Sequence, residues 1–275
     1  MEKPLEIHWR PTPPGAPTGA RRVASKSNKL ARMTVQNIQF IQDEVAEVWR
    51  DVRWAESVGS TNAELLADGQ PGDVLIADEQ TAGRGRMGRE WVTPKGSQLC
   101  LSALVEAEPA DRIGLLPLAT GLAVTDVVPQ GRLKWPNDVL VGDKKLAGIL
   151  AEADFNGETP RVVVGVGINV AWRREELPVD NATSLNLEGV EVEWDQFAAD
   201  VLLALGRRFE QWRTGDAQLL EDYRAICATI GQPVRLERAG GDVEGVVEGV
   251  SDTGEILIDG TAYSAGDVTH LRPAS

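Results

Sequence analysis

The sequence predicts an α/β fold, in which a main mixed α/β domain is followed by a small β-barrel. Up to about residue 229, helical stripes of apolar residues alternate with short strand-like runs. After Gly231, short alternating segments are broken by Ala-Gly-Gly, Asp-Thr-Gly and Asp-Gly, as in small barrels. The first 33 residues carry too few apolar side chains to offset the entropy of ordering. We therefore expect a disordered tail at 1–33, the main domain at 34–229 and the barrel at 230–275.

The first part of the main domain is expected to alternate helices and strands. Apolar periodicity and helix-breaking residues assign these elements in chain order. They are a helix at 35–48, a strand at 51–56, a short helix from residue 60 to about residue 69, and strands at 74–77 and 98–105.

The second part continues the alternation. A mostly apolar helix is expected at 111–128, with an irregularity at Pro117, because proline disturbs a helix interior. A helix at 195–213 is predicted by a stripe of apolar residues, namely Phe197, Val201, Leu202, Leu205, Phe209 and Trp212. The other expected elements are strands at 133–135, 139–141, 145–152 and 161–170 and a last helix at 217–229.

Composition excludes several classes of protein. A net charge of -14 argues against a broad nucleic-acid surface, which needs clustered Lys and Arg. No apolar run approaches the roughly 20 residues that span a bilayer, and no signal peptide is evident. Cys100 and Cys227 are expected to be buried thiols of a cytoplasmic protein. With His8 and His270 as the only histidines, neither a structural zinc site nor a His-based catalytic triad is expected.

The loop QTAGRGRMGREW, at 80–91, contains glycines with the G-x-G-x-x-G spacing of a dinucleotide-binding turn. A Rossmann turn requires a helix after the glycines, and Pro94 and Gly96 oppose one here. P-loop and protein-kinase motifs are missing. A flexible solvated loop remains an alternative. However, Arg84, Arg86 and Arg89 alternate with glycines, which favours a loop that closes over an anionic ligand.

The stretch KWPNDVLVGDKKLAGILAE, at 134–152, predicts a β-hairpin with its turn at residues 142–143. Strict alternation would place Lys145 on one face with Ala147, Ile149 and Ala151, leaving Lys144 to the solvent. A lysine on an apolar face is rarely unpaired. We therefore expect Lys145 to meet a buried anion.

Two further motifs allow both structural and functional interpretations. Ser60-Thr61-Asn62 precedes Glu64, and Thr61-x-x-Glu64 fits a helix capping box, although a helix N-terminus can also present polar groups to a ligand. In Gly165-x-Gly167-x-Asn169 the glycines permit close strand packing, and Asn169 could face a cleft. Without a histidine-based nucleophile, the chemistry must depend on charge stabilisation and positioning, which fits acyl activation by ATP.

These motifs together resemble those of the biotin protein ligases. The resemblance covers the chain from about residue 57 and rests on STN, QTAGRGRMGREW, KWPNDVLVGDKKLAGILAE and VVGVGINV, in family order and spacing. It implies the α/β fold shared with lipoate ligases and related to class II aminoacyl-tRNA synthetases, with an SH3-like C-terminal domain. It also implies a cytoplasmic ligase that converts biotin and ATP, with Mg²⁺, to biotinyl-5′-AMP. The biotinyl group would then pass to a lysine of a biotin carboxyl carrier domain.

The resemblance also implies roles for individual residues. Catalysis would fall to Lys145, Arg84 and Arg86. Biotin would be bound by Ser60, Thr61, Asn62, Gln80, Arg84, Gly85, Arg86 and Lys145. The nucleotide and the adenylate would be bound by Arg86, Trp91, Asn137, Lys145 and Asn169. Mg²⁺ would arrive with ATP, without a dedicated protein cage.

The stretch before the STN motif is shorter than in those family members that carry an additional N-terminal domain. Some members carry an N-terminal winged helix-turn-helix that binds DNA, and about thirty patterned residues are too few for one. We therefore expect the monofunctional type, with no DNA partner and no membrane partner. The alternatives are a lipoate or octanoyl ligase, a non-enzymatic sensor of biotinyl adenylate that binds DNA, and a Rossmann oxidoreductase.

Overall fold

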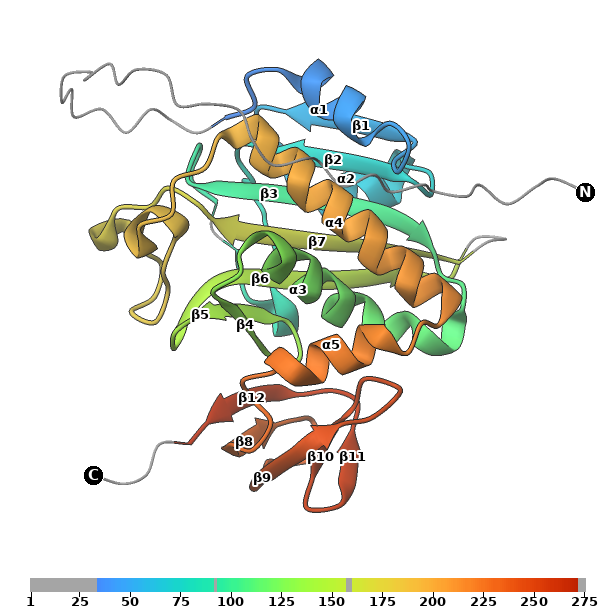
Figure 1. The fold of residues 1–275 in the computed structure, drawn as a ribbon, viewed down its shortest axis with the longest axis vertical. Coiled ribbons are helices and arrows are strands. Elements are labelled where there is room, and N and C mark those ends of the chain that lie inside the picture. The colour runs from blue at the N-terminus through green and yellow to red at the C-terminus, as the bar shows by residue number, and fades with distance from the viewer. Residues whose placement is uncertain (1–33, 92, 157–159, 272–275) are drawn as a thin grey trace, which may run out of the picture. The chain divides into compact units, whose positions relative to one another are not determined.

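The main sheet contains seven strands in the order β1-β2-β3-β7-β6-β5-β4 (Figure 1). The computed structural model describes residues 34–91, 93–156 and 160–271, so the predicted tail at 1–33 lies outside the described residues. β1 runs parallel to β2, and every other pair in this sheet is antiparallel. The strands are β1 (Asp51–Ala55), β2 (Asp73–Ala77), β3 (Gln98–Glu106), β4 (Gly131–Lys134), β5 (Asp138–Val141), β6 (Lys144–Asp154) and β7 (Arg161–Asn169). The mixed sheet predicted from the sequence is thereby confirmed.

Helices cover both faces of this sheet. α1 (Ile38–Val45), α3 (Leu116–Val127) and α4 (Trp194–Thr214) pack on one face, and α4 runs obliquely across the strands (Figure 1). The predicted apolar stripe of α4 is buried there. α2 (Thr61–Asp68) packs on the other face, where Leu65 meets Leu75, Leu104 and Val163. α5 (Gln218–Ile226) contacts α3 and α4.

Two helical predictions need correction. The helix expected at 111–128 is a 3₁₀ segment (Ala110–Leu115) followed by α3, and Pro117 stands in the first turn of α3. Proline is well tolerated there, because the first N–H groups of a helix have no acceptor within it. The helix expected at 35–48 is shorter, because Asn37 caps it and it ends at Val45.

The C-terminal residues form a five-stranded antiparallel sheet in the order β11-β10-β9-β8-β12. Its strands are β8 (Pro233–Glu237), β9 (Val243–Val250), β10 (Ile256–Ile258), β11 (Thr261–Tyr263) and β12 (Asp267–His270). This sheet agrees with the SH3-like part predicted from the sequence, and the Nε1 of Trp135 ties the main sheet to it by donating to the Gly254 carbonyl. The division into domains at residue 229 remains a prediction. In the part of the chain that the structure describes, no helix has the length and apolar character needed to cross a membrane.

Candidate functional site

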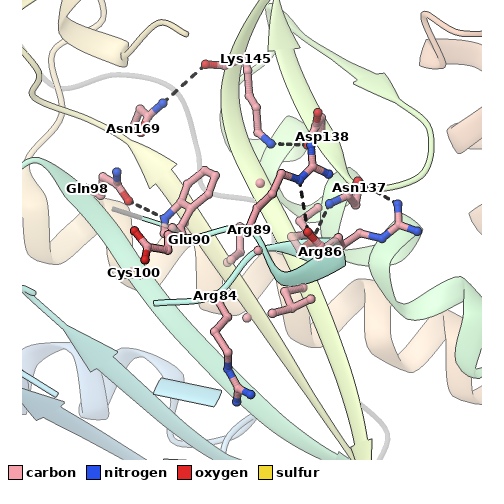
Figure 2. A pocket seen from close by; sticks show the side chains of 18 of the residues that line it. Arg84, Arg86, Arg89, Glu90, Gln98, Cys100, Asn137, Asp138, Lys145 and Asn169 are labelled. Carbon is pink, nitrogen blue, oxygen red and sulfur yellow. Dashed lines mark hydrogen bonds and ion pairs between the residues drawn. The ribbon is translucent and has the colours of Figure 1, made fainter. Parts of the chain in front are cut away.

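A cavity of about 330 Å³ opens on the sheet face that carries α2 (Figure 2). Its wall combines strands β3, β6 and β7 with the start of α2 and the arginine loop at 83–91. All of the site residues predicted from the sequence line it: Ser60, Thr61, Asn62, Gln80, Arg84, Gly85, Arg86, Trp91, Asn137, Lys145 and Asn169.

The floor of the cavity is set by strand register. β3 and β7 pair so that Gln98 faces Asn169, Cys100 faces Gly167, and Ser102 faces Gly165. Because side chains alternate along a strand, Gly165, Gly167 and Asn169 project from one face. Val166 and Ile168, which lie between them, enter the helix-covered core instead.

The glycines of this floor make room for side chains from other elements. A Cβ at Gly165 would lie 2.4 Å from Oδ1 of Asn62, and one at Gly167 would lie 2.4 Å from Nε1 of Trp91. A Cβ at Gly148 would lie 2.7 Å from the Trp91 ring. Close approach of Asn62 and Trp91 to the sheet, rather than strand packing, therefore explains the glycine spacing in VVGVGINV.

Lys145 points into the cavity, but the predicted reason was wrong. The β5–β6 register passes from Val139 opposite Ala147 to Leu140 opposite Lys145, so one residue, Leu146, forms a bulge. The bulge reverses the alternation and places Lys145 on the cavity face, away from the buried face of Ala147. The expected anion is the carboxylate of Asp138, 2.6 Å from Nζ, and both side chains are largely buried. The Trp91 ring centroid lies 5.2 Å from Nζ, within cation–π range.

The arginine loop forms a closed hairpin rather than the start of a helix. The N–H of Trp91 donates to the Gly83 carbonyl at 2.9 Å, and that of Gly85 donates to the Arg89 carbonyl at 2.7 Å. A single 3₁₀ turn, Arg86–Gly88, lies at its tip. This geometry removes the Rossmann alternative for the glycine spacing, because the next element in the described part of the chain is strand β3 and not a helix.

The three arginines of the loop have different partners. Arg84 pairs with Glu152 at 3.2 Å. Arg86 donates to the Gly266 carbonyl at 3.1 Å and to Oδ1 of Asn137 at 3.4 Å. Arg89 pairs with Asp267, which also lies 3.5 Å from Arg86. Burial lowers the pKa of Arg86, and the nearby Asp267 opposes that shift, so its guanidinium remains charged.

The start of α2 contributes a hydrogen-bonded network. Ser60, not Thr61 as predicted, caps the helix by accepting from the N–H of Ala63. Thr61 is thereby free to donate from its hydroxyl to Oε1 of Gln80 at 3.0 Å. Asn62 accepts from the Ser102 hydroxyl at 2.6 Å and donates to the Glu152 carboxylate at 2.8 Å. These bonds fix the orientation of the Asn62 amide.

Asn169 retains an unused acceptor. The residue is buried, and its Oδ1 has no hydrogen-bond partner among the described residues. Its Nδ2 donates to the Lys145 carbonyl at 3.5 Å, as Figure 2 shows. A buried unpaired amide oxygen is costly unless a ligand or water satisfies it. This supports the prediction that Asn169 faces a bound molecule.

Several residues of the site were missed from the sequence. Asp138 and Lys134 stand in the quoted hairpin motif, and their cross-strand pairing follows from its register. Glu152 ends the same motif, but its contacts with Asn62 and Arg84 depend on other elements, and Ser102 and Asp267 carried no local signal that distinguishes them from ordinary polar residues.

The reactivity of the Cys100 thiol tests whether solvent reaches the floor of the cavity. Burial raises the pKa of its thiol to about 12. At pH 8 only about 1 thiol in 10,000 is then ionised, and the thiolate is the reactive form. We expect native protein carrying Cys227→Ser to resist iodoacetamide at pH 8 and to gain one adduct in urea, as measured by intact mass. Rapid alkylation of Cys100 in the native protein would contradict this burial.

Comparison with known proteins identifies two matching family models. Residues 54–169 match the biotin/lipoate A/B protein ligase family, and residues 229–271 match the biotin protein ligase C-terminal domain. The chain is 43% identical to the biotin–[acetyl-CoA-carboxylase] ligase of Mycobacterium tuberculosis, covering 82% of this chain and 90% of that protein. It is 35% identical to the bifunctional ligase/repressor BirA of Escherichia coli, covering 74% of this chain and 67% of that protein.

The fold also has counterparts among solved structures. A biotin protein ligase from Aquifex aeolicus, in complex with biotin and ATP, superposes with a TM-score of 0.72 at 28% identity. The superposition covers 82% of this chain and the whole of that one.

Proposed function

The chain belongs to the biotin protein ligase family, and from that premise we propose that it joins biotin to a carrier protein in two steps. In the first step, ATP and biotin form biotinyl-5′-AMP and pyrophosphate. In the second, a lysine of a biotin carboxyl carrier domain takes the biotinyl group and AMP leaves. The observation that carries this proposal is the meeting of Lys145, Arg84 and Arg86 with Asn62, Gln80 and Asn169 around one cavity.

The first step requires two anions to meet. An oxygen of the biotin carboxylate attacks the α-phosphorus, and the bond from that phosphorus to the leaving pyrophosphate breaks. Lys145 offsets the repulsion between the two anions by exchanging Asp138 for substrate oxygens. Arg86 closes over the product and shields the mixed anhydride from water. Because the substrate carboxylate is the nucleophile, no enzyme nucleophile is needed.

The polar network at the start of α2 is suited to the ureido ring of biotin. We assign Ser60, Thr61, Asn62 and Gln80 to this end, because their hydroxyl and amide groups line the cavity. Trp91, Asn137 and Asn169 form the nucleotide end, where an indole face and amides can stack on and bond to adenine and ribose.

Magnesium would enter with the triphosphate. Among the described residues, no three His, Cys, Asp or Glu side chains gather into a metal site. Mg²⁺ is commonly held by one or two carboxylates together with substrate phosphates. We therefore expect the substrate phosphates to hold most of the magnesium coordination, without a dedicated protein cage.

The deciding experiment is incubation with biotin, MgATP and a carrier domain, followed by a streptavidin blot. We expect a biotinylated carrier only when all three are present. A matched reaction with lipoate or octanoate tests the related ligase activity. No transfer of biotin would refute the proposal, and transfer of lipoate instead would assign the site to the other branch of the fold. A gel shift with operator DNA at moderate salt would instead favour the alternative that the protein is a DNA-binding sensor of biotinyl adenylate.

Two glycines should separate the biotin end from the nucleotide end. Gly165→Ala places a methyl group against Asn62, so we expect the KM for biotin to rise about 10-fold or more, the effect of about 1.4 kcal/mol. Gly167→Ala places one against Trp91, so the KM for ATP should rise instead. The KM for biotin and the KM for ATP are each measured in steady-state assays in which that substrate is varied and the other is saturating. A rise in both constants for each variant would show that the two ends are not separate.

A further inference from the structure

Charged side chains gather where the main sheet meets the C-terminal sheet. Arg86 and Arg89 reach across to Asp267 at the start of β12, and Lys145 pairs with Asp138 of β5. Lys134, at the end of β4, lies within electrostatic range of Asp138, Lys145, Asp267 and Arg89. We call these side chains the junction cluster: Lys134, Lys145, Arg86, Arg89, Asp138 and Asp267.

Lys134 differs from the other cations of the junction cluster. Arg86, Arg89 and Lys145 each have a carboxylate within ion-pair distance. No hydrogen bond or ion pair joins the Lys134 ammonium to any residue in the described ranges. Yet Lys134 lines the cavity and is only partly exposed, and burial is the main cause that lowers its pKa. Lysine is rarely buried without a partner, so this side chain is suited to an anion that comes from outside.

The position of Lys134 identifies which part of a substrate it would meet. Its cross-strand partner is Asp138, so both project from the same side of the hairpin as Lys145. Lys134 also lies near two side chains of the C-terminal sheet, the Asp267 carboxylate and the His270 imidazole, and near Arg89 of the arginine loop. The biotin end, around Asn62 and Gly165, lies where the start of α2 meets β3 and β7 instead. An anion beyond Lys145 on the C-terminal side would meet four cations and two carboxylates, which suits a group with several negative charges.

We infer that Lys134 is a catalytic residue that binds the pyrophosphate portion of ATP. This inference depends on the proposed function, because pyrophosphate is the leaving group of the first step. As the bond to the α-phosphorus breaks, negative charge accumulates on the leaving oxygens. A lysine that is already held in a partly buried site stabilises that charge, and its surroundings need not reorganise during the reaction. The second step involves no pyrophosphate, so Lys134 has no role in it.

The two steps can be measured separately. Step one is followed as biotin-dependent exchange of labelled pyrophosphate into ATP, and step two as transfer from synthetic biotinyl-5′-AMP to the carrier domain. For Lys134→Ala we expect step one to fall about 100-fold, the usual loss for one stabilising donor, and inhibition by free pyrophosphate to weaken. Transfer from the synthetic adenylate should proceed at the wild-type rate. Lys134→Arg should restore part of step one.

Lys144→Ala is the matched control. Lys144 lies on the same hairpin and carries the same charge, but it does not line the cavity. We expect both steps to be unchanged in this variant. Because Lys134 has no partner to lose among the described residues, Lys134→Ala should keep the wild-type Tm, which shows that it folds.

Two outcomes of these assays would contradict the assignment of Lys134, and a third would contradict the proposed function. Equal losses in both steps, or an unchanged first step with unchanged pyrophosphate inhibition, would overturn the assignment of Lys134. Failure of the wild-type protein in both steps would instead refute the proposed function itself.

Discussion

Replacing Lys145 with alanine is expected to lower the rate of biotinyl-adenylate formation by about 10²–10³-fold, the typical loss for one preorganised charge donor. The ammonium lies 2.6 Å from Asp138 and beside the Trp91 ring, so it is already held where the reacting anions must meet. Its removal also leaves the Asp138 carboxylate facing those anions without its ion-pair partner. Pyrophosphate release with biotin and MgATP measures the effect. A normal rate from Lys145→Ala would exclude this residue from the chemistry.

A double variant separates the two parts of this loss. In Lys145→Ala with Asp138→Asn, the repulsive carboxylate is gone as well. We therefore expect the double variant to recover part of the activity that Lys145→Ala loses. The loss that remains measures the stabilisation by Lys145, and strictly additive losses would show that the two residues do not act on one another.

The case of Lys145 shows what a sequence pattern can and cannot provide. Composition and residue type indicated a lysine that meets an anion, and the structure confirms it. The face was deduced from strict alternation, and the bulge at Leu146 makes that deduction wrong. A bulge depends on how β5 and β6 pair, so alternation within one strand does not reveal it.

The fold was more accessible to sequence reasoning than the supporting contacts of the site. Apolar periodicity located the strands and α4, because the same pattern that buries a side chain also defines the element. The helix cap was assigned to Thr61, since Ser60 and Thr61 both suit a cap and only the backbone distinguishes them.

Supporting contacts were missed because they join distant parts of the chain. Asp267 meets Arg89 across 178 positions of sequence, and Glu152 meets Asn62 across 90. A single carboxylate among 42 acidic residues carries no local mark of such a role. The arginine loop was recognised because its glycines and arginines are adjacent in the sequence, whereas the residues that hold it in place are not.

Replacing Arg86 with alanine is expected to release biotinyl-5′-AMP into solution. The variant loses a bond to the Gly266 carbonyl and contacts with Asn137 and Asp267. Among the described residues, the loop then keeps only the Arg89 link to the C-terminal sheet. A charged hydrogen bond contributes about 1.5–3 kcal/mol, so we expect adenylate to dissociate roughly 10–100 times faster. Filtration of enzyme incubated with biotin and MgATP, without carrier, measures the free adenylate.

Two controls make the result specific to closure of the loop. Arg213→Ala removes the same charge from an exposed pair with Glu210 on α4, and it should release no additional adenylate. Asp267→Asn preserves the bonds of Arg86 to Gly266 and Asn137, and the asparagine oxygen can still accept from the arginines, so its leak should be smaller than that of Arg86→Ala. If Asp267→Asn leaks as much as Arg86→Ala, the ion pair with β12 holds the loop closed. If Arg86→Ala retains its adenylate, Arg86 does not close the cavity.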